Sequence, residues 1–165
     1  MHRSITYWRQ LSENFLKILE NFLELFGPMD HLVDFYLFQV PPKFDDVARM
    51  LRFAEATKLG ERFALEIRNK ELLGNDEACA EIMKKVTLVS VDSSDYRNRI
   101  FPGKIVYMRI HGRNISYSYN YSQTEISETI RKIREFEPEK IYICFNNDHN
   151  MLENARMTLK VFSGL

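Results

Sequence analysis

The fold is decided by two stretches of alternating sequence, residues 63–68, which read FALEIR, and residues 105–111, which read IVYMRIH. Successive side chains of a β-strand point to opposite faces of the sheet. In the first stretch Glu66 and Arg68 therefore share one face, and the aliphatic residues share the other. In the second stretch Arg109 and His111 share one face, and the aliphatic residues that alternate with them share the other. Both predict strands whose aliphatic face packs against helices and whose opposite face carries charge.

Before, between and after these two strands, short apolar runs alternate with amphipathic segments along the whole chain. Apolar residues recurring every three or four positions predict helices, and short apolar runs bounded by turn residues predict strands. Such alternation indicates parallel strands joined by right-handed crossovers, so the predicted class is α/β. We expect helices over residues 11–26, 45–60, 76–85, 122–137 and 151–162, and five strands over residues 34–40, 63–67, 87–91, 105–110 and 141–145.

Composition indicates one globular domain over residues 1–165, with 45% hydrophobic residues and with 23 Lys and Arg balanced by 23 Asp and Glu. A formal net charge of zero gives no general attraction to nucleic acid, and Arg97, Arg99 and Lys104 form the best local basic group. We therefore expect no nucleic-acid partner.

The sequence has no apolar run of about 18 residues, so no membrane partner or membrane span is predicted. The first nine residues lack the apolar core of a secretion signal. Two cysteines, Cys79 and Cys144, are too few for a disulfide framework. Together these features favour a cytoplasmic location.

Polar side chains follow every predicted strand. The carboxyl ends of parallel strands share one rim, where functional groups gather. An unpaired buried charge costs several kcal/mol, so we expect Glu66, Arg68, Arg109 and Asp92 to pair with one another. The strand-end residues are Gln39, Glu66, Arg68, Asp92, Arg109, His111, Asn146, Asn147 and Asp148.

This set contains groups suited to acid/base chemistry. Glu66 or Asp92 can serve as acid or base, and His111 supplies a titratable imidazole that can assist proton transfer. Arginine guanidinium groups bind anions, and asparagine amides orient substrates. Interior ion pairs of parallel barrels are also often purely architectural, so a structural reading stays open. No short metal-ligand spacing is present, and no metal is assigned.

The strand ends form an ordered set of short motifs: QxPP at residues 39–42, ExR at 66–68, Asp92, RxHG at 109–112, YS at 121–122 and FNND at 145–148, followed by Asn154 and Ala155. This set resembles the motifs of the DUF72 (YecE-like) family over nearly the whole chain. The resemblance implies a TIM-type (β/α) barrel, here partial, whose five parallel strands correspond to strands 4 to 8. It implies no particular reaction, because the family's activity is unassigned, and the cofactor is unknown.

Combining the residues with the resemblance, we expect hydrolase- or lyase-type acid/base chemistry on an anionic or hydroxyl-rich small substrate. The alternative is a non-catalytic binding or assembly subunit whose interior charges are structural. In the first case the catalytic residues are Glu66, Asp92 and His111, and the substrate-binding residues are Gln39, Arg68, Arg109, Tyr121, Asn146 and Asn147.

The chain is shorter than the roughly 250 residues typical of an eight-stranded barrel. Five parallel strands do not close such a barrel, and an open sheet leaves two unpaired edges. The expected partner is a separately encoded N-terminal barrel fragment. The alternatives are a homodimer and a truncated product of marginal stability.

Overall fold

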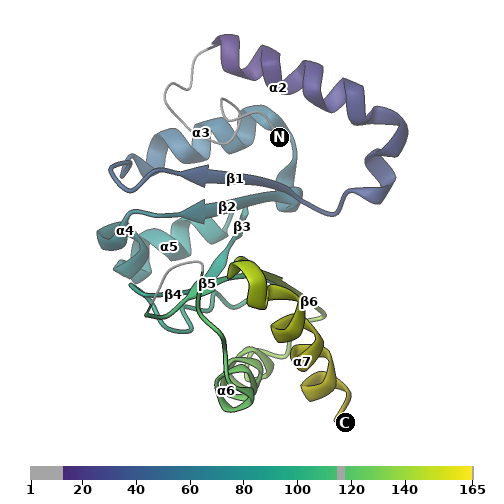
Figure 1. Cartoon of the computed structure of the whole chain (residues 1–165). Helices are drawn as coiled ribbons and strands as arrows, with labels where there is room; N and C mark the ends of the chain where they lie inside the picture. Colours follow the sequence, from purple (N-terminus) through teal and green to yellow (C-terminus); the bar gives the residue numbers. More distant parts are fainter. Residues whose placement is uncertain (1–12, 115–117, 165) are drawn as a thin grey trace. The chain divides into compact units, whose positions relative to one another are not determined.

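The computed structural model describes residues 13–114 and 118–164. The chain divides into two compact units, unit 1 (Met1–Leu88) and unit 2 (Val89–Leu165). Each contains a three-stranded parallel sheet, with strand order β1-β2-β3 in unit 1 and β4-β5-β6 in unit 2 (Figure 1). This confirms the α/β class and the parallel pairing, and the barrel stays a prediction. No helix among the described residues is long and apolar enough to cross a membrane.

The first described element of unit 1 is a long helix, as predicted, and the helix expected over residues 45–60 runs from Val47 to Thr57. Asp46 is the N-cap of this helix, because its side chain accepts a hydrogen bond from the backbone N–H of Arg49. The elements are α2 (Glu13–Phe26), η1 (Gly27–Leu32), β1 (Tyr36–Val40), α3 (Val47–Thr57), η2 (Gly60–Arg62), β2 (Phe63–Ile67), α4 (Lys70–Gly74), α5 (Asp76–Met83) and β3 (Thr87–Leu88).

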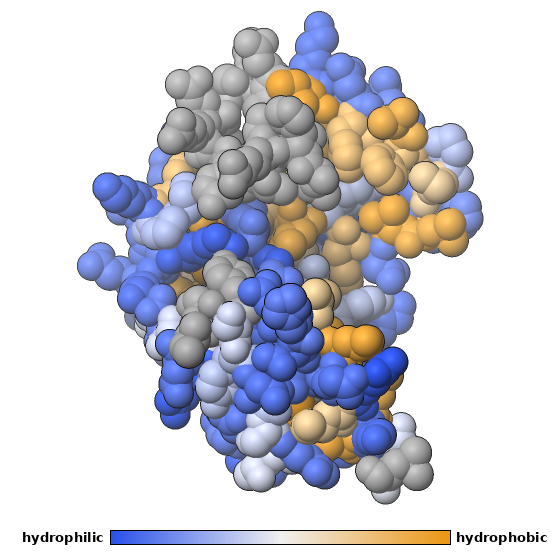
Figure 2. Space-filling view, in the orientation of Figure 1, coloured by the Kyte–Doolittle hydropathy of each residue, from blue (hydrophilic) through white to orange (hydrophobic). Residues whose placement is uncertain are grey.

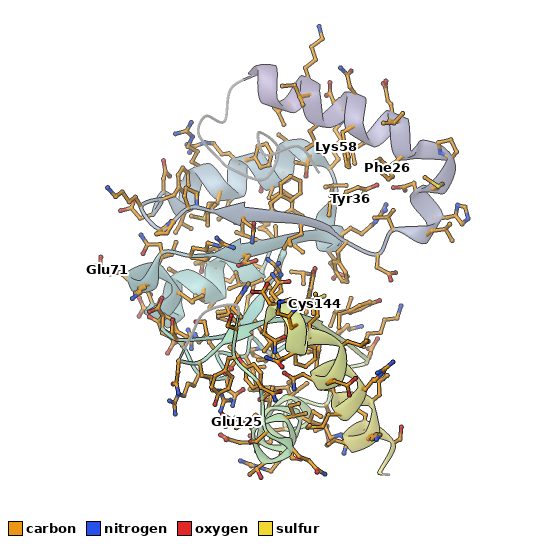
Figure 3. The ribbon with its side chains drawn as sticks, viewed as in Figure 1. Phe26, Tyr36, Lys58, Glu71, Glu125 and Cys144 are labelled. Atoms are coloured by element: carbon orange, nitrogen blue, oxygen red, sulfur yellow. The ribbon has the colours of Figure 1, made fainter. Side chains whose placement is uncertain are left out.

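An aromatic cluster holds unit 1 together on one face of its sheet. The rings of Phe38 on β1 and Phe63 on β2 stack with centroids 4.2 Å apart, and Phe53 of α3 meets both edge-on. Helix α2 adds Phe22, whose ring lies 6.3 Å from Tyr36. Figure 3 shows Tyr36 on β1 and the neighbouring α2. Because β-strand side chains alternate, this packing leaves the opposite face to Gln39 and Glu66 on β1 and β2.

Unit 2 also combines a three-stranded parallel sheet with α-helices. Its first α-helix begins with a capping box: the Ser122 hydroxyl accepts from the Glu125 backbone N–H, and the Glu125 carboxylate accepts from the Ser122 backbone N–H. The elements of unit 2 are β4 (Ser90–Ser93), β5 (Ile105–Gly112), α6 (Gln123–Arg134), β6 (Lys140–Phe145), η3 (Asp148–Asn150) and α7 (Met151–Ser163).

The core of unit 2 lies between its sheet and α6. Val106, Met108 and Ile110 of β5 are buried, and they form one cluster with the isoleucines of α6. In the strand register, Met108 lies beside Ile143 of β6, so this apolar face continues across both strands. Arg109 falls on the opposite face, as the alternation of residues 105–111 predicts.

Two local expectations are corrected. The predicted strand over residues 87–91 is two strands, β3 and β4, separated by Val89, since β3 pairs with β2 and β4 pairs with β5. The short helix α4 was not predicted. It begins at an N-cap, Asn69, whose side chain accepts from the Leu72 backbone N–H, and five residues are too few to show helical periodicity.

Candidate functional site

In unit 1, a buried carboxylate lies at the carboxyl end of the sheet. The parallel register places Gln39 of β1 directly beside Glu66 of β2. The Gln39 side-chain amide donates to one Glu66 oxygen at 2.8 Å, and Arg68 Nε donates to the other at 3.3 Å. Glu66 is only 2% exposed, whereas the Arg68 side chain is 29% exposed. The predicted Glu66–Arg68 pair is therefore present, and Gln39 belongs to the same cluster.

This cluster is suited to recognising a polar group. Each Glu66 oxygen has a donor, so the orientation of the carboxylate is set before any ligand arrives. Arg68 presents a planar guanidinium whose geometry matches carboxylates and phosphates. The unit 1 cluster thus joins a positioned carboxylate with a partly exposed cation.

In unit 2, Arg109, His111 and Asn146 lie at the carboxyl ends of β5 and β6. Backbone alternation puts Arg109 on the face opposite the apolar core, whereas His111 lies at a register irregularity between β4 and β5 and is buried. The Asn146 backbone N–H donates to Ile110 O at 2.7 Å. Its side-chain amide contacts the Arg109 guanidinium, with the amide oxygen as the acceptor. Two predicted site residues of unit 2, Arg109 and Asn146, are therefore in contact.

Asp92 has different surroundings. The register places Asp92 beside Ile110 and Val91 beside Arg109, so Asp92 lies on the face that packs against α6. The carboxylate is fully buried. It accepts from Arg113 Nε at 2.9 Å, and from the Tyr121 hydroxyl at 2.6 Å. The expected pairing of Asp92 with Arg109 is wrong: the cation that binds Asp92 within unit 2 is Arg113, because the strand register puts Asp92 and Arg109 on opposite faces.

Arg113 is the cation that sequence reasoning missed. Gly112 has a φ of 98°, a left-handed conformation that favours glycine, and the chain leaves the strand there. Arg113 then reaches Asp92 and also Glu125, whose place on α6 is shown in Figure 3. Strand alternation does not extend through such a turn. One signal could have pointed to Arg113: a buried carboxylate needs a cationic partner, and Arg113 is a cation close to the end of the strand beside Asp92.

Two pKa shifts follow from this buried network. Burial and the hydrogen bond to Asp92 raise the pKa of the Tyr121 hydroxyl far above its ordinary value. Burial acts to lower the pKa of Arg113, but the hydrogen bonds and negative charge of Asp92 outweigh it and raise the pKa. Tyr121 therefore stays protonated and Arg113 stays charged, which suits a positioning role.

Asn147 belongs to a ladder of side-chain amides. It is fully buried, and its Nδ2 donates to Tyr119 O at 2.7 Å and to Asn154 Oδ1 at 2.6 Å. Asn154, on α7, accepts from the Tyr121 backbone N–H and donates to Tyr121 O. Within the described residues, Asn147 Oδ1 has no hydrogen-bond partner. A role for Asn154 could not be predicted from the sequence, because its contact with Tyr121 joins residues more than thirty positions apart.

The sequence-predicted residues thus divide into three groups. Gln39, Glu66 and Arg68 form one cluster in unit 1, and in unit 2 Arg109 contacts Asn146, with His111 two residues after Arg109 on β5. Asp92, Tyr121 and Asn147 belong to the buried networks behind the unit 2 sheet. In the described part of the chain, no three His, Cys, Asp or Glu side chains are grouped as metal ligands.

Parallel strands joined through helices, with charged residues at the strand ends, define a parallel α/β protein. The chain belongs to the DUF72 family: the family model described as "Protein of unknown function DUF72" matches residues 1–162. The resemblance found in the strand-end motifs is therefore confirmed.

Solved structures of DUF72 family proteins have the same fold. The one from Enterococcus faecalis V583 is 23% identical, with a TM-score of 0.72 over 94% of this chain and 71% of that chain. The one from Thermotoga maritima MSB8 is 22% identical, with a TM-score of 0.75 over 98% of this chain and 71% of that chain. A comparison with curated proteins finds no match. These likenesses concern the fold alone.

Proposed function

We propose that the chain carries an acid/base site, of hydrolase or lyase type, for an anionic or hydroxyl-rich small substrate. The observation that carries the proposal is the Glu66 carboxylate. It is 2% exposed at the carboxyl end of β2, and Gln39 and Arg68 hold its two oxygens. The carboxylate can transfer a proton, and the partly exposed guanidinium beside it can bind an anion.

In this proposal Glu66 is the acid or base, Gln39 orients it, and Arg68 binds the substrate. In unit 2, His111 assists proton transfer, while Arg109 and Asn146 bind substrate. The proposal retains the TIM-type barrel that the family resemblance implies, because functional groups of that fold gather at the carboxyl ends of the strands.

Asp92, Tyr121 and Asn147 are assigned positioning roles instead of contact with substrate. Support comes from their burial and their hydrogen bonds: both Asp92 oxygens accept from protein donors, and the Tyr121 hydroxyl donates to Asp92. A carboxylate that is fully buried and whose oxygens already accept from protein donors is not accessible to a substrate.

The test is a thermal-shift screen of small anions, polyols and sugars against the parent chain and Glu66→Gln. The proposal expects at least one compound to raise the parent Tm and Glu66→Gln to lose that response. Asp30→Asn is the matched control. Asp30 is also paired with an arginine of unit 1, since Arg62 lies 2.8 Å away, but it precedes β1 and is not at the carboxyl end of a strand. A Glu66→Gln response equal to the parent response contradicts the proposal.

A second candidate function is a non-catalytic binding or assembly subunit. The observation that favours it is the Asp92–Arg113 ion pair, whose side chains are 0% and 5% exposed. A pair so buried stabilises the fold and does not face a ligand. If Glu66 is architectural in the same sense, Glu66→Gln lowers the free energy of unfolding by a few kcal/mol. The discriminating result is then a parent chain whose Tm responds to no compound of the panel.

A further inference from the structure

One buried asparagine of α7, Asn154, joins the loops that follow two strands of unit 2. The residue is fully buried. Its Oδ1 accepts from Asn147 Nδ2 at 2.6 Å, and Asn147 lies shortly after the end of β6. The same side chain binds the backbone of Tyr121, which lies between β5 and α6. Asn154 therefore links the segments that follow the carboxyl ends of β5 and β6.

The contact between Asn154 and Tyr121 is two-sided, as in the pairing of two strands. The Tyr121 backbone N–H donates to Asn154 Oδ1 at 3.2 Å, and Asn154 Nδ2 donates to the Tyr121 carbonyl oxygen at 3.2 Å. Nδ2 also donates to Asn120 Oδ1 at 3.0 Å. Because the amide oxygen faces donors and the amide nitrogen faces acceptors, the orientation of the Asn154 amide is determined. The amide thus fixes the position and the direction of the backbone at Tyr121.

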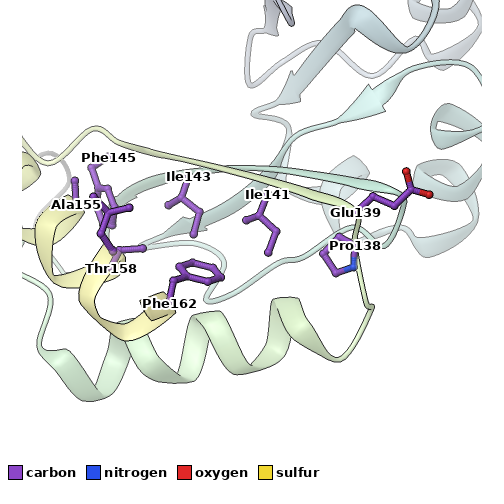
Figure 4. A pocket seen from close by; sticks show the side chains of 9 residues that line it. Pro138, Glu139, Ile141, Ile143, Phe145, Ala155, Thr158 and Phe162 are labelled. Atoms are coloured by element: carbon purple, nitrogen blue, oxygen red, sulfur yellow. The ribbon is translucent and has the colours of Figure 1, made fainter. Parts of the chain in front are cut away.

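The other surroundings of α7 do not call for an amide. Ala155 and Thr158 line an apolar pocket of about 550 Å³ between β6 and α7 (Figure 4). Leu152 and Leu159 are exposed. Figure 2 shows apolar residues at the surface over β6 and α7. Burial of an amide is unfavourable unless its hydrogen bonds are made, so the polar contacts of Asn154 are what distinguish it from an apolar residue at this position.

Through Asn147, Asn154 acts on a pair of residues that the proposed function uses to bind substrate. Asn147 follows Asn146 directly in the chain, and Asn146 contacts the Arg109 guanidinium. The hydrogen bond to Asn154 holds the Asn147 side chain, together with its hydrogen bond to Tyr119 O at 2.7 Å. Loss of the Asn154 amide would free the loop after β6, and Asn146 would then lose its fixed place beside Arg109.

Through Tyr121, Asn154 acts on the end of β5. The Tyr121 hydroxyl accepts from the Gly112 backbone N–H at 3.1 Å. Gly112 directly follows His111, which the proposed function uses for proton transfer. Asn154 holds the backbone of Tyr121, and the Tyr121 hydroxyl holds the backbone beside His111. Two links therefore connect one amide of α7 to the backbone that carries this imidazole.

We propose that Asn154 is the positioning residue for the unit 2 part of the acid/base site. The inference rests on the proposed function, from which Arg109, Asn146 and His111 have their roles. Asn154 does not contact substrate. It holds the loops after β5 and β6 to each other, so that these three side chains keep their places before a ligand arrives. Fixed placement of this kind is what substrate binding and proton transfer require.

The test compares Asn154→Leu with the parent chain by NMR. Leucine is similar in volume and has no hydrogen-bonding group in its side chain. The signals to follow are the side-chain amide of Asn146, the Nε–H of Arg109 and the imidazole of His111. We expect all three to shift or broaden in Asn154→Leu, at a temperature where circular dichroism shows that the variant is folded. No ligand is needed for this readout.

Inorganic phosphate is then titrated as a probe of the arginine, because guanidinium groups bind phosphate. The Arg109 Nε–H signal reports the binding. The apparent Kd for phosphate is expected to be weaker by about tenfold or more in Asn154→Leu than in the parent, since a small misplacement of a binding group has an effect of this order.

Thr158→Val is the matched control. Thr158 is also a buried polar residue of α7, and its hydroxyl donates to Asn154 O at 2.8 Å, within the helix. Its loss should lower the Tm and leave the three signals where the parent has them. If Asn154→Leu does not fold, Asn154→Asp takes its place: the carboxylate keeps an acceptor for Asn147 and removes the donor to Tyr121 O.

Two results overturn the proposal. The first is an Asn154→Leu chain with a lower Tm but with the three signals and the phosphate affinity of the parent, because Asn154 is then a packing residue. The second is an equal change of the signals in Thr158→Val, because loss of any buried polar group of α7 then disturbs the site. Failure of the proposed function looks different: the signals move only in Asn154→Leu, which upholds the role of Asn154, but neither phosphate nor any compound of the thermal-shift panel binds the parent.

Discussion

Replacing Arg113 by methionine removes the cation from the buried network of unit 2. Met keeps most of the aliphatic stem, so the change isolates the loss of the guanidinium. In the parent, Arg113 Nε lies 2.9 Å and its terminal nitrogen 3.2 Å from the two Asp92 oxygens. The variant leaves a fully buried carboxylate with hydrogen bonds from the Tyr121 hydroxyl and the Asn98 backbone N–H alone.

The magnitude follows from the burial of both partners. The Arg113 and Asp92 side chains are 5% and 0% exposed, so solvent does little to screen the orphaned charge. Breaking a buried pair by removing one partner costs about 3–5 kcal/mol of unfolding free energy. Arg113 also contacts the less buried Glu125, and loss of that pair adds at most about 1 kcal/mol.

The assay is urea unfolding followed by circular dichroism, applied to a double-mutant cycle. The cycle contains Arg113→Met, Asp92→Asn and the double variant. The double variant should be destabilised by much less than the sum of the two single variants, with a coupling energy of about 2 kcal/mol or more. Arg131→Met is the control: its ion pair with Glu135 is more than half exposed, and its loss should cost about 0.5 kcal/mol or less.

A cost for Arg113→Met below about 1 kcal/mol would refute the reasoning, because a buried unpaired carboxylate is not tolerated so cheaply. Additive single-variant costs would also refute it, since they would mean that Arg113 and Asp92 stabilise the fold independently. Either outcome would remove the basis for giving Asp92 a positioning role.

Three further predictions concern capping, packing and pH. Hydrogen bonds from Arg62 lower the pKa of Asp30 from 3.8 to about 2, so its stabilisation is present above about pH 4 and is lost as pH falls toward 2. The Tm difference between the parent and Asp30→Asn should therefore shrink over that range; a constant difference would contradict this. Ser122→Ala should lower the unfolding free energy by about 1 kcal/mol through loss of the α6 N-cap, while the exposed Thr124→Ala should have a smaller effect, and equal urea midpoints would count against the cap. Phe38→Ala, at a site 2% exposed in the aromatic cluster, should cost about 3–5 kcal/mol in urea unfolding, and a loss under about 1 kcal/mol would show that the cluster is not a core.

Much of the local structure could be predicted because it depends on neighbouring residues. The bounds of β2, Phe63–Ile67, agree with the predicted strand, and the Ser122–Glu125 capping box is present. The Glu66–Arg68 pair was also predictable, since residues two apart on a strand share a face. These features need only backbone periodicity and hydrogen bonds within a few positions.

The partners of Asp92 could not be predicted in the same way. Its place beside Ile110 comes from the register of two strands, and Arg113 reaches it only because the chain turns at Gly112 with a φ of 98°. Asn154 meets Tyr121 across thirty-three positions. Pairings of this kind depend on loop lengths and packing across the whole unit.

Sequence patterns alone were enough to predict the α/β class, the family, the two-faced strands and the Glu66–Arg68 cluster. These follow from side-chain alternation, from local capping and from an ordered set of strand-end motifs. The folded chain was needed to show that Asp92 faces α6, that Arg113 neutralises it and that an apolar pocket lies between β6 and α7. Register and packing are set by contacts between segments distant in the chain, and no local pattern records them.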